Sequence, residues 1–533
     1  MALGLTPQEI VDKGEYQLLA KASHWERVLL RDVAKVQNGF AFKSSFFNRF
    51  EGVSLIRIRD ISKANTEHRY TGQYDEAYIV KKGHILVGMD GDFSATRWIG
   101  EAALLNQRVC RLTIVSELFD EAFFFTCLQP FLNAINAETS SVTVKHLSSR
   151  SIETIPLPLP PLGEQERIVA KIEQLFSELD KGVEALKAAE AQLNVYRQAL
   201  LKHAFEGKLT ADWREANKDK LESADTLLAR IKTEREARYQ QQLDDWKLAV
   251  KDWEARDRED KKPAKPKKAS KFDTIRPKEL TGFSDLPLGW AYCRLGEFID
   301  HIDAGKSFKC DERPPKGDEI GVAKVSAVTW GEYQEAESKT CTDPTKINPD
   351  YFIKPGDFLF SRANTIELVG ACVVVRAISQ RIMLSDKTLR VHIPNNLEDY
   401  ILQYLRSHNG RREIMARSTG NQDSMRNIGQ ERIRNIVFPI SGYEEGKLVL
   451  EKLGAQLSVV DHMEADVETQ LKKSEALRQS ILKKAFAGQL VPQDPTDEPA
   501  ATLLERIKVE KTATAAKVTN AKAGPKKRRK KAS

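Results

Sequence analysis

Residues 155–209 read IPLPLPPLGEQERIVAKIEQLFSELDKGVEALKAAEAQLNVYRQALLKHAFEGKL. The prolines at the start are typical of a chain leaving a globular domain, and the remainder follows a seven-residue apolar repeat. One row of the repeat is Ile172, Leu179, Leu186, Leu193 and Leu200, and the alternate row is Ile168, Leu175, Gly182, Ala189 and Tyr196. A seam that recurs every 3.5 residues predicts a long helix packed lengthwise against another long helix.

A partner for this helix exists in the same chain. Residues 436–490 repeat the stretch at a constant offset of 281, so that RQALLKHAFEGKL (197–209) matches RQSILKKAFAGQL (478–490). The second seam is less apolar, because Ser474 and Gln456 interrupt it. We predict that the two helices pair through Ile168, Ile172, Leu175, Leu179, Leu186, Leu193 and Leu200 of the first and Leu453, Val460, Val467, Leu477 and Ile481 of the second. The alternative is that the seam is a core stripe of an ordinary helix bundle.

The regions before the two helices also resemble each other. Trp25 matches Trp290, Gly39 matches Gly305, and the offset drifts from 265 to 281. Further matching segments are 78–86 with 351–359, 105–112 with 384–391, and 224–234 with 500–510. Short apolar runs bounded by Gly, Asp or Asn predict strands in both regions. Each repeat is therefore a variable domain followed by a helix of fixed length, which predicts an α+β fold with an internal repeat and antiparallel long helices.

These patterns divide the chain into seven segments. We expect a first domain at 1–158, a central long helix at 159–209, a charged helix and Lys/Pro-rich linker at 210–284, a second domain at 285–440, a second long helix at 441–490, a C-terminal helical segment at 491–519 and a disordered basic tail at 520–533.

Composition bounds the class of protein. With 41% hydrophobic and 30% charged residues, 533 residues fit several globular domains rather than a membrane or disordered chain. No apolar run reaches the length of a membrane span, and the six cysteines form no CxxC pair, so we expect reduced thiols in a cytoplasm. The net charge of +7 equals the charge of the tail at 520–533, which leaves the rest of the chain neutral.

Antiparallel pairing of the helices would hold the two domains at opposite ends of a rod. About 40 helical residues span roughly 60 Å. Half-sites read by two-fold symmetric DNA-binding proteins lie about 34 Å or a multiple of that apart. A rod of constant length is therefore suited to setting the separation of two DNA half-sites.

The segment IPLPLPPLGEQERIVAKIEQLFSELD, the ending RQALLKHAFEGKL and the two-copy plan resemble the specificity subunit of type I restriction-modification enzymes. The resemblance covers residues 20–510, and the PLPPLxEQxRIV motif carries it. The second copy keeps Pro439 but replaces LPPLGEQER (159–167) with ISGYEEGKL (440–448).

The resemblance implies a non-catalytic subunit with two target-recognition domains, each reading half of a bipartite double-stranded DNA site. It also implies partners in a bacterial or archaeal cytoplasm: two methylase (modification) subunits that methylate adenine, and restriction subunits that translocate DNA. No cofactor is expected on this chain, whereas S-adenosylmethionine, ATP and Mg would be bound by the partners.

The residues agree with a non-catalytic role. Neither a methyltransferase NPP-aromatic motif nor a glycine-rich cofactor loop is present, and Ala304–Gly305–Lys306–Ser307 lacks the earlier glycine of a P-loop. The nine histidines lie apart in the sequence, so their spacing predicts no metal site. A protein-protein scaffold with two partner-binding end domains is the alternative function, and an autonomous methyltransferase or nuclease is a third.

For DNA contacts we favour polar and basic residues at matching places in the two domains, because Arg and Lys suit guanine edges and phosphates while Asn and Gln suit adenine edges. In the first domain these are Asn38, Lys43, Arg57, Arg59, Arg97, Lys145, His146, Ser149 and Arg150. In the second they are Lys306, Lys309, Lys324, Arg362, Asn364, Asn421, Gln422, Ser424 and Arg426. The loops 138–146 and 418–427 are the favoured units, since both occupy the same place in the repeat. Any single residue of the set also fits a solvated loop position. The tail would add sequence-independent phosphate affinity.

Overall fold

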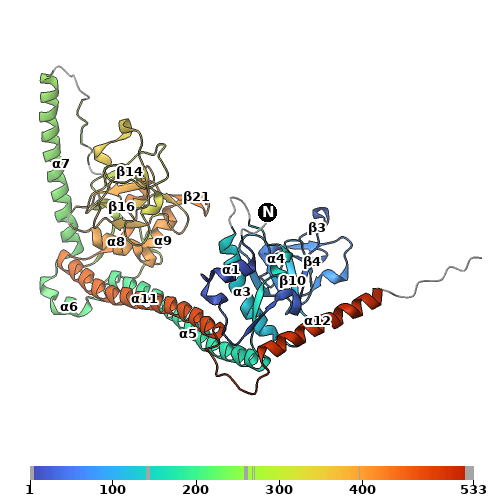
Figure 1. The fold of residues 1–533 in the computed structure, drawn as a ribbon. Helices are drawn as coiled ribbons and strands as arrows, with labels where there is room; N and C mark the ends of the chain where they lie inside the picture. Colours follow the sequence, from blue (N-terminus) through green and yellow to red (C-terminus); the bar gives the residue numbers. More distant parts are fainter. Residues whose placement is uncertain are drawn as a thin grey trace, which may run out of the picture. The chain divides into compact units, whose positions relative to one another are not determined.

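The computed structural model describes residues 5–139, 145–256, 262–266, 268, 271–394 and 396–522 (Figure 1). The chain forms two compact units. Unit 1 combines Met1–Leu186 with Glu468–Ser533, and unit 2 is Lys187–Val467. Each unit therefore contains one globular domain and one half of each long helix. The tail at 523–533 and residues 140–144 of the predicted first-domain loop lie outside the described residues.

The domain of unit 1 is built on three sheets. The two-stranded sheet pairs β1 (Glu26–Leu29) with β11 (Pro156–Leu159), antiparallel. The four-stranded antiparallel sheet has the order β2 (Ala34–Asn38), β10 (Val109–Ile114), β7 (Ile85–Gly88), β8 (Ser94–Arg97). The five-stranded sheet has the order β3 (Phe47–Asn48), β5 (His68–Tyr70), β4 (Val53–Ile56), β9 (Ala103–Leu105), β6 (Ile79–Val80), and β4 runs parallel to β9. The helices are α1 (Pro7–Lys13), α2 (Leu30–Val33), α3 (Glu121–Glu138) and α4 (Ser149–Glu153).

The domain of unit 2 repeats this topology. It pairs β12 (Ala291–Arg294) with β23 (Val437–Ile440), antiparallel. Its four-stranded sheet has the order β13 (Ile302–Ala304), β20 (Thr388–Val391), β16 (Phe358–Ser361), β18 (Cys372–Val374). A third sheet has the order β15 (Ser338–Thr340), β14 (Ile320–Ala323), β19 (Arg381–Met383), and β14 runs parallel to β19. A fourth contains β17 (Ala363–Asn364), β22 (Met425–Asn427) and β21 (Thr419–Gln422), and the helices are α8 (Glu398–Arg406), α9 (His408–Arg417) and α10 (Gln430–Arg434). The shared strand order confirms the predicted α+β class.

The matched glycines mark the same close backbone approach in both domains. A Cβ at Gly39 would lie 2.0 Å from the carbonyl oxygen of Asn106, and one at Gly305 would lie 1.9 Å from that of Leu384. Asn106 and Leu384 belong to the segments 105–112 and 384–391, which match in the sequence. Because only a hydrogen fits at either place, the chain requires glycine at both.

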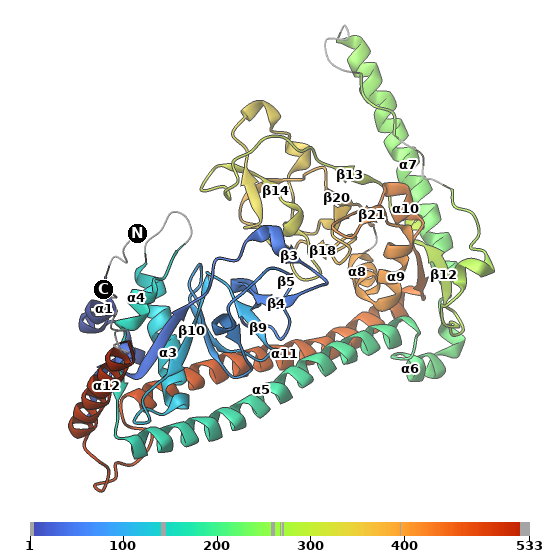
Figure 2. The same ribbon diagram turned by 90° about the vertical axis from the view of Figure 1, so that its right-hand side faces the viewer.

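The two long helices have the same length and the same bounds within their repeats. α5 is Leu162–Phe205 and α11 is Tyr443–Phe486, each of 44 residues and offset by 281 (Figure 2). In unit 1, Ile168 and Ile172 at the start of α5 are buried with Ile481 near the end of α11. In unit 2, Leu200 near the end of α5 is buried with Leu453 and Val460 near the start of α11. The helices therefore pair antiparallel in each unit. Leu175, Leu179, Leu186, Leu193 and Val467 are half-buried along the same seam.

Three predicted seam positions are exposed: Leu477, Tyr196 and Gly182. The side chain of Leu477 is 52% exposed, and Arg478 takes its place in the seam, where its guanidinium lies 4.4 Å from the centre of the Phe176 ring. Tyr196 is 51% exposed, and its neighbour Arg197 is half-buried instead. A strict seven-residue count misses the first two of these positions because long charged side chains with apolar stems, Arg197 and Arg478, contribute to the seam beside them.

The start of α5 explains the glutamate and glutamine of its motif. Glu164 is buried, and its carboxylate accepts a hydrogen bond from Trp25 Nε1 (3.0 Å). The Gln165 side chain donates to the carbonyl of Pro160 (2.9 Å) and accepts from the amide of Asp120 (2.8 Å). These bonds fix the direction in which α5 leaves the domain. At the equivalent place in α11, Glu445 is buried as well and accepts from Thr210 Oγ1 (2.7 Å), so α11 begins at the matching residue although the motif is lost.

The helix that follows each long helix packs on the domain of the other repeat. After α5, the chain forms α6 (Ala211–Ala216) and α7 (Ala224–Ala255), and the first turns of α7 pack into the core of unit 2 through Leu227 and Ile231. After α11, the chain forms α12 (Ala500–Lys522), which packs into the core of unit 1 through the equivalent Leu503 and Ile507. Each domain core is therefore completed by the helix that follows the long helix of the other repeat. No helix in the described part of the chain is long and apolar enough to cross a membrane.

Candidate nucleic-acid interface

The hairpin β21–β22 is an exposed polar surface of unit 2. Its residues 419–425 are all exposed, and its second strand pairs with β17, which places Asn364 opposite Arg426. The backbone amide of Ile366 donates to the carbonyl of Asp423 (2.7 Å), and that of Ile428 donates to Arg362 (2.9 Å). Backbone bonds therefore hold the hairpin against the segment 362–366.

Five residues of this region were predicted to contact DNA, and their side chains differ in whether they hydrogen-bond within the protein. Arg426 donates to the carbonyl of Gly420 (2.7 Å) and to Ser418 Oγ (2.9 Å), so its side chain fixes the base of the hairpin. The side chains of Asn421, Gln422 and Ser424 make no hydrogen bond to any described residue. Asn364 donates weakly to Ser361 Oγ (3.4 Å). The free amides at the tip are thus the groups available to a ligand.

The three predicted lysines of the second domain do not gather with the hairpin as a set. Lys306 and Lys309 are exposed in the segment after β13, and Ser307 Oγ donates to the Asp386 carboxylate. The carbonyl of Lys387, the residue after Asp386, accepts a hydrogen bond from the backbone amide of Arg362 (3.0 Å). These contacts link the Lys306 segment to the segment 362–366 beside the hairpin. Lys324 Nζ instead faces the carbonyl of Glu312 (3.5 Å).

In unit 1, the end of β2 and the segment 145–150 come together. Asn38 Nδ2 donates to Ser149 Oγ (3.1 Å). The backbones of His146 and Asp90 form an isolated antiparallel β-bridge, and His146 Nδ1 lies 2.6 Å from the Asp90 carboxylate. Lys145 Nζ donates to the carbonyl of Asn136 (2.6 Å). Arg150 is exposed and makes no ion pair with a described residue. These five predicted residues form one polar surface.

The other four predicted residues of the first domain lie apart from that surface or have partners of their own. Arg97 pairs with Glu121 and lies 5.1 Å from the centre of the Phe125 ring, so it holds β8 to α3. Arg59 forms an ion pair with Glu67 at 3.7 Å. Arg57 begins a short 3-10 turn, and Lys43 is exposed.

Sequence reasoning missed one basic pair at matching positions. Arg108 is 54% exposed and pairs with Asp90 at 2.8 Å, which adds it to the surface around His146. Lys387 occupies the same place in the second repeat, is exposed, and lies in the loop beside Arg362. The alignment of 105–112 with 384–391 contains the signal, because a basic residue stands at the fourth position of both segments.

The buried thiols of Cys110 and Cys372 are unsuited to nucleophilic catalysis. Burial raises the pKa of the Cys110 and Cys372 thiols to about 12. A thiol with such a pKa is protonated near neutral pH and is a poor nucleophile. Both are buried in the four-stranded sheets, where Cys110 pairs with Asn38 and Cys372 pairs with Phe360.

The chain matches known proteins over nearly its full length. Residues 22–188 match the family described as the type I restriction modification DNA specificity domain. The EcoBI specificity subunit of Escherichia coli is 30% identical over 98% of this chain and 100% of its own length. The EcoKI specificity subunit of Escherichia coli strain K12 is 23% identical over 75% of this chain and 73% of its own.

A solved structure shares the fold. A chain from a study of complex assembly and conformational transition of the type I R-M system superposes with a TM-score of 0.56 at 17% identity, and covers 88% of this chain and 99% of that one. The repeated domains on paired helices and the full-length match to EcoBI lead to one conclusion: the chain belongs to the specificity subunits of type I restriction enzymes, a non-catalytic family of DNA-recognition subunits.

Proposed function

We propose that each domain reads one half of a bipartite site on double-stranded DNA. Both domains present exposed polar groups at the same place in a shared topology: the surface around Asn38 and His146 in unit 1, and the β21–β22 hairpin in unit 2. Asparagine and glutamine side chains without protein partners suit adenine edges, and the nearby basic groups suit phosphates and guanine. The two surfaces differ in sequence, so they would read different half-sites.

The paired helices would set the length of the spacer between the half-sites. The observation that carries this proposal is that α5 and α11 have identical lengths and equivalent bounds while the domains before them vary in loop length. A helix pair fixed in length keeps the distance between two reading surfaces constant while the surfaces themselves change.

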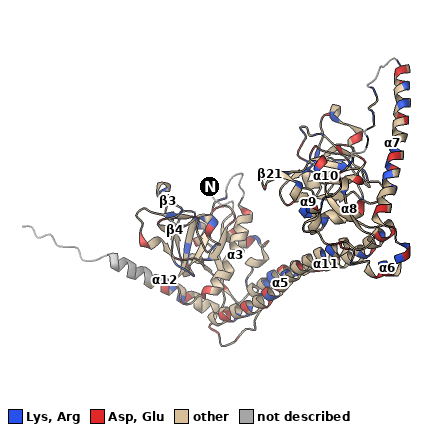
Figure 3. Cartoon of the chain, turned by 180° about the vertical axis from the view of Figure 1, so that it is seen from behind, with Lys and Arg blue, Asp and Glu red and all other residues tan. Residues whose placement is uncertain are grey.

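The same helices would dock the partner subunits. Lys, Arg, Asp and Glu alternate on the exposed faces of α5 and α11 (Figure 3). Two equivalent helix faces would give two equivalent places for methylase subunits, which bring S-adenosylmethionine and methylate adenine. Restriction subunits that use ATP and Mg for translocation and cleavage would join that core. All of these cofactors would belong to the partners, in a bacterial or archaeal cytoplasm.

Footprinting of the complex with its methylase subunits tests the half-site proposal. We expect two protected, sequence-constrained segments around a spacer of free sequence. A single contiguous site would contradict the proposal. A complex that assembles normally and ignores DNA sequence would favour the alternative, a protein-protein scaffold.

An insertion series tests the spacer. Seven residues inserted after Gly182 and seven after Met463, its equivalent at the offset of 281, keep the seam in register because the repeat is seven residues long. We expect a longer spacer with both half-sites unchanged. The control is the same insertion in one helix alone, which puts the pair out of register and should reduce binding to every spacer length. A change in half-site sequence would contradict the modular assignment.

A further inference from the structure

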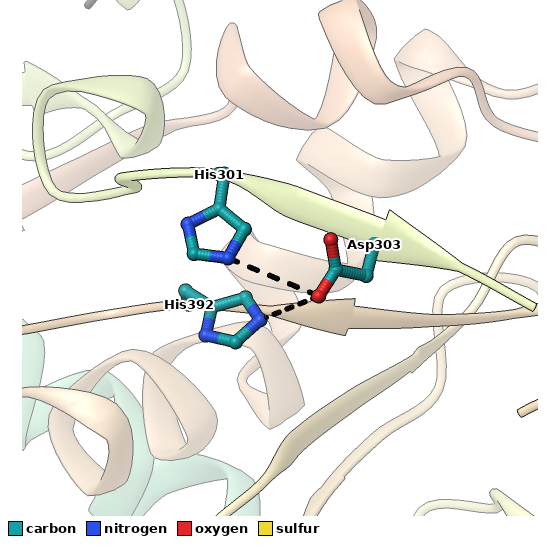
Figure 4. Close-up of side chains that lie close together, drawn as sticks. All are labelled: His301, Asp303 and His392. Atoms are coloured by element: carbon teal, nitrogen blue, oxygen red, sulfur yellow. Dashed lines mark hydrogen bonds and ion pairs between the residues drawn. The ribbon is translucent and has the colours of Figure 1, made fainter. Parts of the chain in front are cut away.

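Two histidines and an aspartate converge at one edge of the four-stranded sheet in unit 2. His301 precedes β13, Asp303 lies within it, and His392 follows β20 (Figure 4). His392 Nε2 lies 2.8 Å from Asp303 Oδ2, and His301 Nε2 lies 3.8 Å from the same oxygen. One ligand atom from each residue lies within 4.8 Å of the other two. Strand pairing thus brings His392 to His301 and Asp303, from which it is far apart in the sequence.

The backbone fixes this arrangement. His301 and Asp303 are two residues apart on an extended segment, so their side chains point to the same face. The backbone amide of His392 donates to the carbonyl of His301 (3.0 Å), which makes the two histidines cross-strand neighbours. Their rings stack with centroids 3.7 Å apart and planes inclined by 16°. Both Nε2 atoms point toward the Asp303 carboxylate (Figure 4).

The surrounding charges leave the Asp303 carboxylate available. The Arg390 guanidinium approaches Asp303 only to 4.0 Å and pairs with Asp357 at 2.9 Å. The neighbouring Asp300 is engaged by Arg238 at 3.3 Å and Arg235 at 3.5 Å.

We propose that His301, Asp303 and His392 bind a divalent transition-metal ion of the Zn²⁺ type. Two imidazoles and one carboxylate are ligands that Zn²⁺ prefers, whereas Mg²⁺ and Ca²⁺ prefer oxygen alone. A tetrahedral ion about 2.0–2.1 Å from each ligand holds the ligand atoms roughly 3.3 Å apart. The observed separations of 2.8 and 3.8 Å lie on either side of that value, and small rotations of the two rings would equalise them. The His301 side chain is 59% exposed, so solvent can supply the fourth ligand.

The first domain provides an internal comparison. The equivalents of His301, Asp303 and His392 are Lys35, Gln37 and Thr113, and Thr113 pairs with Lys35 in the sheet of unit 1. The strand geometry is therefore shared by both repeats, and the ligand set belongs to the second domain alone. An ion at this place would tie the start of β13 to the end of β20 and so stabilise unit 2.

Co²⁺ titration of the full-length chain without an affinity tag tests the proposal. We expect one ion per chain, with the visible d–d absorption of a four-coordinate site and no thiolate charge-transfer band. Zn²⁺ should displace Co²⁺ and raise the midpoint of thermal unfolding, and Mg²⁺ should do neither. His301→Ala, Asp303→Asn and His392→Gln should each lower the Co²⁺ affinity by at least about tenfold.

The matched control is His462→Ala, which removes an exposed histidine on α11 and should leave the Co²⁺ affinity unchanged. Circular dichroism in a chelator should show that all variants are folded before metal is added. Co²⁺ affinity that survives loss of His301 and His392 would overturn the proposal. A thiolate band that disappears in Cys310→Ser would also overturn it, because the ion would then lie at the half-buried cysteines.

Discussion

Arg197 forms an ion pair with Asp461 across the long helices, and this contact is made again with the partners exchanged. Arg478 is the equivalent of Arg197 at the offset of 281, and it pairs with Asp180, the equivalent of Asp461. The first pair lies in unit 2 and the second in unit 1. The internal repeat is thus conserved down to individual contacts, and the register of α5 against α11 is the same in each unit.

We predict that Arg197→Ala and Arg478→Ala destabilise the chain by similar amounts. Their aspartate partners are 60% and 59% exposed, so each pair should contribute about 0.5–1 kcal/mol to the free energy of unfolding. Urea denaturation of the single and double variants measures the loss. Lys187→Ala, at an exposed site on α5 with no ion pair to a described residue, is the control and should change nothing. If Lys187→Ala lowered the free energy of unfolding by the same amount, the loss in the arginine variants would not be due to the two ion pairs.

Glycine substitutions should separate close packing from helix propensity. Gly39→Ala and Gly305→Ala force a Cβ onto a carbonyl oxygen, and each should lower the free energy of unfolding by about 1–3 kcal/mol. Gly182 lies inside α5 with nothing within 4 Å of an added Cβ, so Gly182→Ala should raise it by about 1 kcal/mol. Thermal unfolding shows the opposite signs directly. A neutral effect at Gly39 would mean that the loop at Asn106 can move away.

The Glu279–Arg294 contact in unit 2 predicts a pH dependence. A hydrogen bond from the Arg276 amide and the nearby Arg294 guanidinium lower the pKa of Glu279 to about 2 from its usual value of 4.5. A carboxyl group with a lowered folded-state pKa stabilises the protein above the unfolded-state value, and this stabilisation is lost as the pH falls toward 2.

Glu279→Gln should therefore destabilise the chain at pH 7, and the difference from the parent should shrink between about pH 4.5 and pH 2. Urea titrations at several pH values give this difference. A constant difference across the range would assign the effect to packing rather than to ionisation.

The hairpin should carry specificity for one half-site only. Asn421→Ala and Gln422→Ala remove unpaired amides from its tip, and each should reduce discrimination at one base pair by about 1–3 kcal/mol. Selection of bound sequences by the methylase complex measures both half-sites at once, so the half-site read by the first domain is the control. Arg426→Ala should instead weaken binding without changing which base is preferred, because that side chain holds the hairpin base.

Deletion of 520–533 tests the basic tail. Removing seven positive charges should weaken binding to all DNA sequences alike and flatten the dependence of affinity on salt. Binding to specific and random duplexes at several salt concentrations provides the measurement. Salt dependence equal to that of the parent chain would reject a phosphate-binding role for the tail.

The long helices could be predicted from the sequence because the pattern that specifies them lies in consecutive residues. Apolar residues at heptad spacing and a similar repeat at a constant offset are readable without any tertiary structure. The errors at Leu477 and Tyr196 have a physical cause, since arginine stems fill the seam beside them and a hydropathy pattern does not count arginine as apolar.

The surfaces were predictable as loops but not residue by residue. Residues 419–425 are exposed, although the segment forms a hairpin and Ser418 is buried, whereas the roles of Arg97 and Arg426 depend on partners that sequence spacing does not reveal. The His301–Asp303–His392 cluster was likewise invisible, because His392 lies 89 residues from Asp303 and only strand pairing brings them together. The sequence alignment showed that 224–234 and 500–510 are equivalent, but it did not show which domain each helix covers.

The packing of α12 on the first domain has a consequence for biosynthesis. The first domain leaves the ribosome before the second, yet its core includes Ile481, Leu503 and Ile507, which are translated after the second domain. Unit 2 is one continuous segment and contains every residue of its own core. The second domain should therefore complete its core before the first, and the apolar surface around Trp25 and Ile168 should stay uncovered until α11 and α12 have been synthesised.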